Sequence, residues 1–165
     1  MTFTKLTLRM VVPEDKPFIQ DVYFETQRWL IEALFGWRGD EIELAKFAES
    51  YDAGNTSIIV VDDDDVGWLT VQRGEHIELE AIYLKPSAQG RSIGTAVVQD
   101  LISEAQSAAK PLRLSTAKIN PARQLYERLG FVDVGESEFK TFMEWRPACP
   151  QTTRKSTFAQ RNTAE

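Results

Sequence analysis

The sequence has 165 residues and a net charge of −6 at pH 7. This length, with 42% hydrophobic and 27% charged residues, predicts one globular domain with a sizeable core. We see no apolar run near the ~20 residues that span a bilayer, and we see no secretory signal. We therefore expect no membrane association and a cytoplasmic location. The single cysteine, Cys149, fits that location.

The distribution of charge and histidine excludes several function classes. No long basic block is present, which argues against nucleic-acid binding, because phosphate neutralisation needs clustered Lys and Arg. The single histidine, His76, has few partners of the right type. We therefore expect no His/Cys metal site and no Ser–His–Asp relay.

Strand and helix patterns alternate along the chain. In chain order we expect a strand at 5–12, helices at 13–35 and 40–51, a strand at 55–61, a solvated turn at "DDDD" (62–65), and strands at 66–74 and 76–86. A glycine-bearing loop and a helix follow, then a strand at 111–118, a helix that opens with Asn120 as N-cap, and a final pair of strands over 131–147 with a turn near Gly135. The order predicts an α/β fold with a mixed sheet, a single domain over 1–147 and a disordered tail over 148–165.

The loop in "KPSAQGRSIGTAVV" has the composition of a phosphate site. No lysine follows Gly94, so it is not a Walker loop, and two glycines do not make a dinucleotide fingerprint. Small residues at a helix N-terminus still let a pyrophosphate approach unpaired amides, and Arg91 adds positive charge. If the preceding strand, which ends at Pro86, splays from its parallel neighbour, its backbone can bind an extended amide-bearing arm. Coenzyme A has both features.

Two motifs resemble those of the GNAT N-acetyltransferase superfamily. "IYLKPSAQGRSIGTAVV" resembles its acyl-CoA loop, Q/R-x-x-G-x-G/A, with Gln89 first and Gly94 last. "NPARQLYERLGF" is similar to its second signature, and the match covers roughly 5–147. The resemblance implies a sheet of about seven strands flanked by about four helices. Ser92 replaces the first motif glycine; we expect serine to adopt helical angles there, and its hydroxyl either crowds the pyrophosphate or donates a hydrogen bond to it.

The resemblance assigns a set of residues to acetyl-CoA. Backbone amides of the loop hold the pyrophosphate, and the strand before the loop offers its backbone to the pantetheine arm. Tyr126 belongs to the binding set and is, in addition, the general acid that protonates the departing thiolate. Each assignment has a structural alternative: the loop is an ordinary helix start, Asn120 is a plain N-cap, and Tyr126 is a packing residue. The full set is Ile82, Tyr83, Leu84, Gln89, Gly90, Arg91, Ser92, Ile93, Gly94, Thr95, Asn120, Arg123 and Tyr126.

The base that accepts the amine proton has two main candidates. Glu78 and Glu80 lie two apart on one strand and so share a face. Glu78 matches the spacing of the catalytic carboxylate in histone-type members and is slightly preferred, while Glu80 is closer to the acyl end. Glu138, a water chain or no base remain as alternatives, and either glutamate could be a solvated strand residue.

The function implied by the resemblance is transfer of an acetyl group from acetyl-CoA to a primary amine, by direct attack and without a metal. An aromatic and acidic lining would suit a small-molecule amine, although most of the aromatic residues are also candidates for the core. The alternatives are a non-catalytic acyl-CoA-binding module and a protein lysine or N-terminal acetyltransferase; we expect a monomer or homodimer. The lining residues are Trp29, Phe35, Trp37, Glu25 and Glu32.

Overall fold

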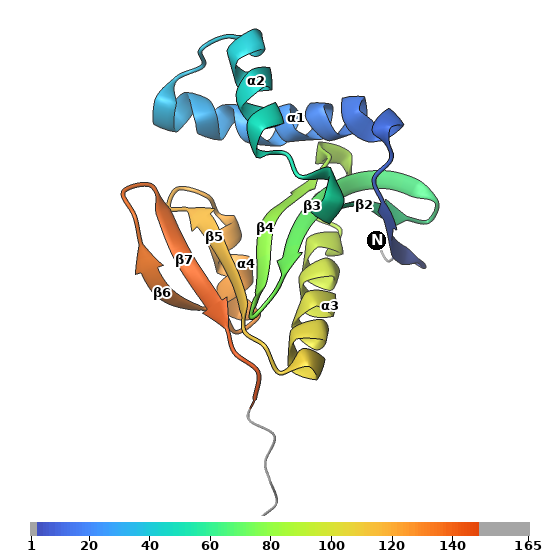
Figure 1. The fold of residues 1–165 in the computed structure, drawn as a ribbon, viewed down its shortest axis with the longest axis vertical. Helices are drawn as coiled ribbons and strands as arrows, with labels where there is room; N and C mark the ends of the chain where they lie inside the picture. Colours follow the sequence, from blue (N-terminus) through green and yellow to red (C-terminus); the bar gives the residue numbers. More distant parts are fainter. Residues whose placement is uncertain (1–2, 149–165) are drawn as a thin grey trace, which may run out of the picture.

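A computed structural model describes residues 3–148 of the chain (Figure 1). The strands are β1 (Leu6–Met10), β2 (Thr56–Val61), β3 (Asp64–Arg73), β4 (Ile77–Leu84), β5 (Leu112–Ala117), β6 (Val132–Glu136) and β7 (Lys140–Trp145). The helices are α1 (Lys16–Phe35), α2 (Asp40–Ser50), α3 (Ile93–Ala108) and α4 (Ala122–Arg128). The predicted order of strands and helices is confirmed.

One seven-stranded sheet has the order β1-β2-β3-β4-β5-β7-β6. Its neighbours pair antiparallel except β4 and β5, which are parallel and are joined through α3. The mixed α/β class is therefore confirmed. Because β4 and β5 run in the same direction, the crossover helix α3 must cover one face of the sheet between them.

Two hydrophobic clusters cover the two faces of the sheet. On β3, Leu69 packs into the larger cluster with α3 and α4, while the adjacent Trp68 packs into the smaller one with α1 and α2. This follows from the period of two in a strand, since successive side chains point to opposite faces. The Trp68 indole Nε1 also donates a hydrogen bond to the Ile19 carbonyl (3.1 Å), which fixes α1 against the sheet. In Figure 1, α1 lies across the ends of the central strands.

The parallel pair β4–β5 separates along its length. The two strands pair only at Ile77–Leu112, Glu78–Arg113 and Leu79–Leu114. Beyond this point β4 stays bonded to β3 as far as Leu84, but its other edge has no strand partner. Figure 1 shows the sheet opening between β4 and β5 toward α1. The splay on which the coenzyme A hypothesis depends is present.

Two turns differ from the sequence prediction. The first hairpin turns at Asp62 and Asp63, both with positive φ (49° and 70°), so β3 already begins at Asp64. Two residues with positive φ match the twist of a tight hairpin better than the longer turn we expected. The predicted turn near Gly135 is wrong: Gly135 lies within β6 beside a β-bulge, and the chain turns at 137–139.

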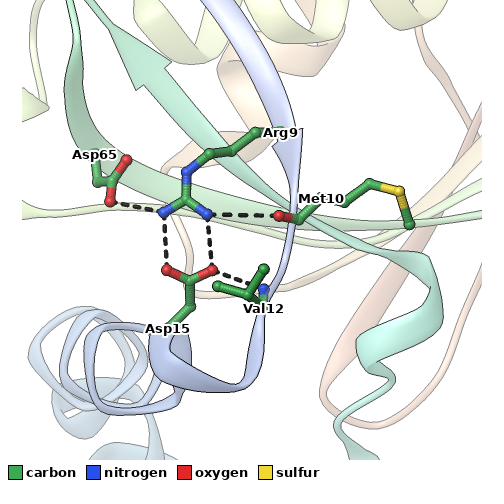
Figure 2. A network of polar contacts seen from close by, with 5 residues as sticks. All are labelled: Arg9, Met10, Val12, Asp15 and Asp65. Atoms are coloured by element: carbon green, nitrogen blue, oxygen red, sulfur yellow. Dashed lines mark hydrogen bonds and ion pairs between the residues drawn. The ribbon is translucent and has the colours of Figure 1, made fainter.

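A polar network joins the N-terminal segment to the sheet (Figure 2). The Arg9 guanidinium donates two hydrogen bonds to the Asp15 carboxylate and one to Asp65, each at 2.8 Å. Asp15 is buried and also accepts a hydrogen bond from the Val12 amide (2.9 Å). The hydrogen bonds from Arg9 and then from Val12 hold the pKa of Asp15 below its ordinary value against the opposing effect of burial. The network fixes the chain where it enters α1.

Replacing Asp15 should lower stability in a pH-dependent way. We expect Asp15→Asn to reduce the free energy of unfolding by about 1–2 kcal/mol at pH 7, because a buried charge-assisted pair is lost. A carboxyl with a depressed folded-state pKa stabilises above its unfolded value of about 3.9 and loses that effect as pH falls through the folded value. Urea unfolding should therefore show a larger difference between variant and wild type at pH 7 than at pH 3. The exposed Asp21→Asn is the control, and an equal loss at both pH values would contradict the assignment.

No helix within residues 3–148 is long and apolar enough to cross a membrane. At the end of the described chain, Ala148 exchanges two hydrogen bonds with the Gln106 side chain of α3. The rest of the predicted tail, including Cys149, lies outside the described residues.

Candidate active site

The glycine-bearing loop leads into α3 through a left-handed residue. Ser92 has φ 61° and ψ 16°, so the expectation of ordinary helical angles is corrected to left-handed ones. The reason is that the loop must reverse direction before α3, and Gly90 does so as well with φ 73°. The first helical hydrogen bond runs from the Ala96 amide to the Ser92 carbonyl (3.1 Å). The amides of residues 93–95 thus precede the helical ladder and are available to an anion.

Gly94 borders a cavity of about 320 Å³ that lies between the loop, the free edge of β4 and α4. A Cβ atom built on Gly94 would meet only the Leu84 Cδ1 atom, at 3.8 Å. The protein itself therefore leaves room for a side chain at Gly94. What glycine provides is open space directly over the amides at the start of α3.

Two polar side chains of the loop have different roles. The Gln89 Nε2 atom donates a hydrogen bond to the Leu84 carbonyl (3.1 Å) and so ties the loop to the end of β4. Arg91 has a buried Nε atom without a hydrogen-bond partner, the one such side-chain atom found within residues 3–148. Such an atom is costly unless a ligand or water pairs with it.

Tyr126 is a buried residue of α4 that lines two cavities. One is the cavity beside Gly94, and the other has a volume of about 260 Å³ and lies under α1. Burial raises the pKa of Tyr126 to about 12. Its ring packs edge to face on Phe131, with centroids 5.7 Å apart. The phenol therefore stays protonated across the neutral range.

The two other predicted residues near α4 are placed differently. Asn120 lines both cavities, and its Oδ1 atom accepts a hydrogen bond from the Ala122 amide (3.0 Å). The N-cap position of α4 is Pro121 and not Asn120 as predicted, because the helix begins at Ala122, one residue later than expected; the Asn120 side chain still pairs the first helical amide. Arg123 is not brought to either cavity: its guanidinium forms ion pairs with Glu127 and Asp133.

A β-bulge places Glu80 at the point where the sheet opens. On β3, Thr70 faces Ala81 and Val71 faces Leu79, which leaves Glu80 without a partner. Bulges re-aim a side chain and are common beside active sites. Glu80 is exposed and borders the cavity under α1 that Tyr126 also lines. No sequence pattern predicts this bulge, because a bulge depends on pairing with a distant strand.

The other candidate bases are farther from Tyr126. Glu78 pairs with His76 (3.3 Å) and lines a cavity of about 430 Å³ on the sheet face toward α2, which Glu80 lines as well. Glu78 and Glu80 therefore do border one space, as their spacing predicts, but Glu78 does not reach the cavity of Tyr126. Glu138 is exposed in the β6–β7 turn and lines neither cavity.

The predicted acceptor lining is only partly assembled. Phe35 lines the cavity under α1, while Trp29 lines the cavity beside Gly94. Trp37 stacks under the Arg28 guanidinium (4.4 Å) outside these cavities, and Glu32 pairs with Arg28 (2.8 Å). Glu25 lines none of these three cavities. The aromatic wall toward α2 comes instead from other residues, of which only Tyr83 was in the predicted acetyl-CoA set: Tyr23, Phe47, Tyr51, Trp68 and Tyr83.

The loop, the opened sheet edge and Tyr126 all fall within a recognised family match. Residues 53–133 match the acetyltransferase (GNAT) domain. This part of the chain is a GNAT acetyltransferase domain. The matched GNAT segment runs from the turn before β2 to β6 and includes both motifs on which the predicted resemblance rested. The predicted enzyme class is confirmed with it.

Solved GNAT structures share the fold at low sequence identity. A PaiA N-acetyltransferase from Thermoplasma acidophilum, in complex with coenzyme A, has a TM-score of 0.70 and 17% identity over 87% of this chain and 99% of its own. A Corynebacterium glutamicum protein described as histone acetyltransferase HPA2 and related acetyltransferase has a TM-score of 0.66 and 23% identity over 90% of this chain and 99% of its own. Ard1 from Thermoplasma volcanium has a TM-score of 0.59 and 16% identity over 88% of this chain and 100% of its own. No curated protein matches the sequence.

The GNAT loop of this chain carries strain at Ser92. A non-glycine residue at left-handed angles costs roughly 1–2 kcal/mol. Glycine would remove this cost but would also increase the entropy of the unfolded state, so the folded protein gains only part of that free energy. We expect Ser92→Gly to raise the free energy of unfolding by about 0.5–1 kcal/mol in urea titrations. The matched control is Ser103→Gly, an exposed site inside α3, which should lower stability by a similar amount. A loss of stability in both variants would contradict left-handed geometry at Ser92.

Within residues 3–148, no group of three or more His, Cys, Asp or Glu side chains could hold a metal ion.

Proposed function

We propose that this protein transfers an acetyl group from acetyl-CoA to the primary amine of a small molecule, by direct attack of the amine. The observation that carries the proposal is the free edge of β4 beyond Leu79, which opens beside the amides at the start of α3. An arm with amide groups can bind to an unpaired strand edge, and a pyrophosphate can bind to a helix N-terminus. These two sites adjoin one cavity, which Tyr126 also lines.

The loop suits a pyrophosphate for three separate reasons. Gly94 leaves space over the amides, Arg91 brings a cation with an unpaired buried Nε atom, and the first turn of α3 has no acidic residue. The coenzyme A complex of the Thermoplasma acidophilum structure is consistent with such a ligand. Acetyl-CoA is thus the donor substrate we propose, with its acetyl end directed along β4 toward Tyr126.

The proposed reaction uses two side chains at the opening of the sheet. The amine nitrogen forms a bond to the thioester carbonyl carbon, the carbon–sulfur bond breaks, and the sulfur leaves as a thiolate. Tyr126 stabilises the thiolate through its phenol proton, which a pKa of about 12 keeps in place at neutral pH. The proton lost by the amine goes to a carboxylate, directly or through water.

Glu80 is the carboxylate that the geometry favours. Motif spacing slightly prefers Glu78, but Glu80 borders the same cavity as Tyr126, whereas Glu78 faces His76. Glu80 also has no ion-pair partner among the described residues that would hold it away from the acceptor. The bulge that aims Glu80 at the opening therefore gives it the role of base in this proposal.

Thiol-release assays on matched variants test this choice. We expect Glu80→Gln to lower turnover by about tenfold or more at neutral pH, since general base catalysis contributes about 10²–10⁴ and water retains part of it. The loss should shrink at high pH, where more of the amine is already neutral. Glu78→Gln, the same change two residues away, should have a smaller effect. Equal losses, or a larger loss for Glu78→Gln, would contradict the assignment.

The competing function, a non-catalytic acyl-CoA-binding module, predicts coenzyme A binding without thiol release with any amine. A panel of small amines against acetyl-CoA separates the two. Release of thiol with at least one small amine supports the proposal, and acetylation of peptides alone would assign the acceptor to proteins instead.

A further inference from the structure

The cavity under α1 and the cavity toward α2 share one wall. The residues they share come from three neighbouring strands and from one position of α1, so the cavities form two lobes of one depression. Their volumes are about 260 and 430 Å³. The shared residues are Tyr23, Glu80, Ala81, Tyr83, Ser115 and Lys140. An acceptor bound beside Tyr126 in the cavity under α1 therefore shares that cavity with both Glu80 and Lys140.

Lys140 is the one cationic side chain that lines either lobe, among the residues the structure describes. No carboxylate of residues 3–148 lies within 4 Å of its ammonium, in contrast with Lys118, which pairs with Glu136 at 3.3 Å. Its backbone is held in place: the Lys140 amide donates to the Ser137 Oγ atom (3.2 Å), and its carbonyl accepts from the Ser137 amide (2.8 Å). An unpaired cation on a fixed stretch of backbone thus lines the depression.

The sheet order sets how far this cation lies from the base. Glu80 is on β4 and Lys140 is on β7, with β5 between them. Two inter-strand spacings amount to about 10 Å in a closed sheet, and the backbones are farther apart here, because β4 and β5 pair only as far as Leu79 and Leu114. Glu80 and Lys140 both line the cavity of about 260 Å³ under α1, whose size suits a short molecule with an amine at one end and an anion at the other.

Charge in the rest of the depression supports this arrangement. Glu80 is available to the amine, whereas the second carboxylate, Glu78, already faces His76. The protein has a net charge of −6, so an anionic acceptor needs a local cation to bind here at all. A diamine, the alternative that an acidic lining suggests, would place a second ammonium near Lys140 and be repelled by it.

We infer that the acceptor carries a carboxylate as well as the reacting amine, as an amino acid does, and that Lys140 binds this carboxylate. The inference rests on the proposed acetyl transfer and adds the chemical class of the acceptor. The aromatic wall toward α2, which includes Trp68 and Tyr51, adds a preference for an apolar or aromatic side chain on that amino acid.

The test measures kcat/KM for thiol release with matched acceptor pairs. Phenylalanine is compared with phenethylamine and methionine with 3-(methylthio)propylamine; phosphoethanolamine and ethanolamine test phosphate as the anion instead. We expect the carboxylate-bearing member of a pair to react at least about tenfold better, and Lys140→Gln to remove this preference. Lys140→Arg should retain most of it, because the cation remains. Lys118→Gln is the control for loss of a lysine from the surface.

The outcomes separate this inference from the proposed function. If the protein binds coenzyme A, two results would overturn the role of Lys140. One is faster turnover of the amines that lack the carboxylate, and the other is no turnover of either member of any pair. A carboxylate preference that survives in Lys140→Gln would overturn it as well, and a preference confined to phosphoethanolamine would replace carboxylate by phosphate. Absence of coenzyme A binding would instead overturn the proposed function, and with it the inference.

Discussion

The Gly94→Val variant should lose acetyl-CoA binding by about a hundredfold or more while remaining folded. A valine side chain would fill the space over the amides at the start of α3, where a pyrophosphate has to approach within hydrogen-bonding distance. The fold has room for it, since the added Cβ meets only Leu84 Cδ1 at 3.8 Å. Calorimetric titration gives the affinity, and thermal unfolding reports the fold.

Gly74→Val is the matched control for this variant. Gly74 lies in the turn between β3 and β4, a Cβ there meets nothing within 4 Å, and the position does not require a positive φ. The same substitution is therefore tolerated by the fold but lies away from the loop. Undiminished acetyl-CoA affinity in Gly94→Val would remove the loop from the binding site.

Tyr126→Phe should lower turnover by about a hundredfold and change coenzyme A affinity by less than about threefold. The substitution keeps the buried ring and its packing on Phe131 and removes only the hydroxyl. Because burial raises the pKa of Tyr126 to about 12, the phenol is protonated throughout pH 6–10. The ratio of wild-type to variant turnover should therefore be constant over that range.

Steady-state kinetics from pH 6 to pH 10, with coenzyme A titrations at pH 7, provide the measurement. A ratio that falls as pH rises toward 9 would mean that the phenol deprotonates earlier than its buried position implies. Equal turnover in the two proteins would show that Tyr126 is only a packing residue. A loss of affinity in step with the loss of turnover would make it a binding residue and not an acid.

The parts of the site that the sequence predicted are those set by local chain geometry. The loop from Gln89 to Thr95 and the cap at Asn120 depend on residues a few positions apart, and their motif spacing is visible in one sequence. Tyr126 follows from its position on a short helix whose start is marked by Asn120 and Pro121. The loop and the short helix form as expected, apart from the left-handed angles of Ser92 and the start of α4 one residue later.

The parts that could not be predicted depend on contacts between distant strands. Glu80 acquires its position from a bulge against β3, and Lys140 acquires its position from the order β4-β5-β7. A lysine at the start of a strand has no distinguishing pattern in the sequence. Gly67 is similar: a Cβ there would lie 2.2 Å from the Tyr83 carbonyl, a close approach that only the pairing of β3 with β4 reveals.

The most direct test of the account is a calorimetric titration of the wild-type protein with acetyl-CoA and with free coenzyme A. The opened β4 edge and the α3 amides predict that both bind at one site, with dissociation constants between about 1 µM and 1 mM. Both ligands should bind, because the loop and the strand edge contact parts that they share. Failure of both ligands to bind at millimolar concentration would contradict the site, leaving a GNAT fold whose loop, with Ser92 in place of glycine, does not hold a pyrophosphate.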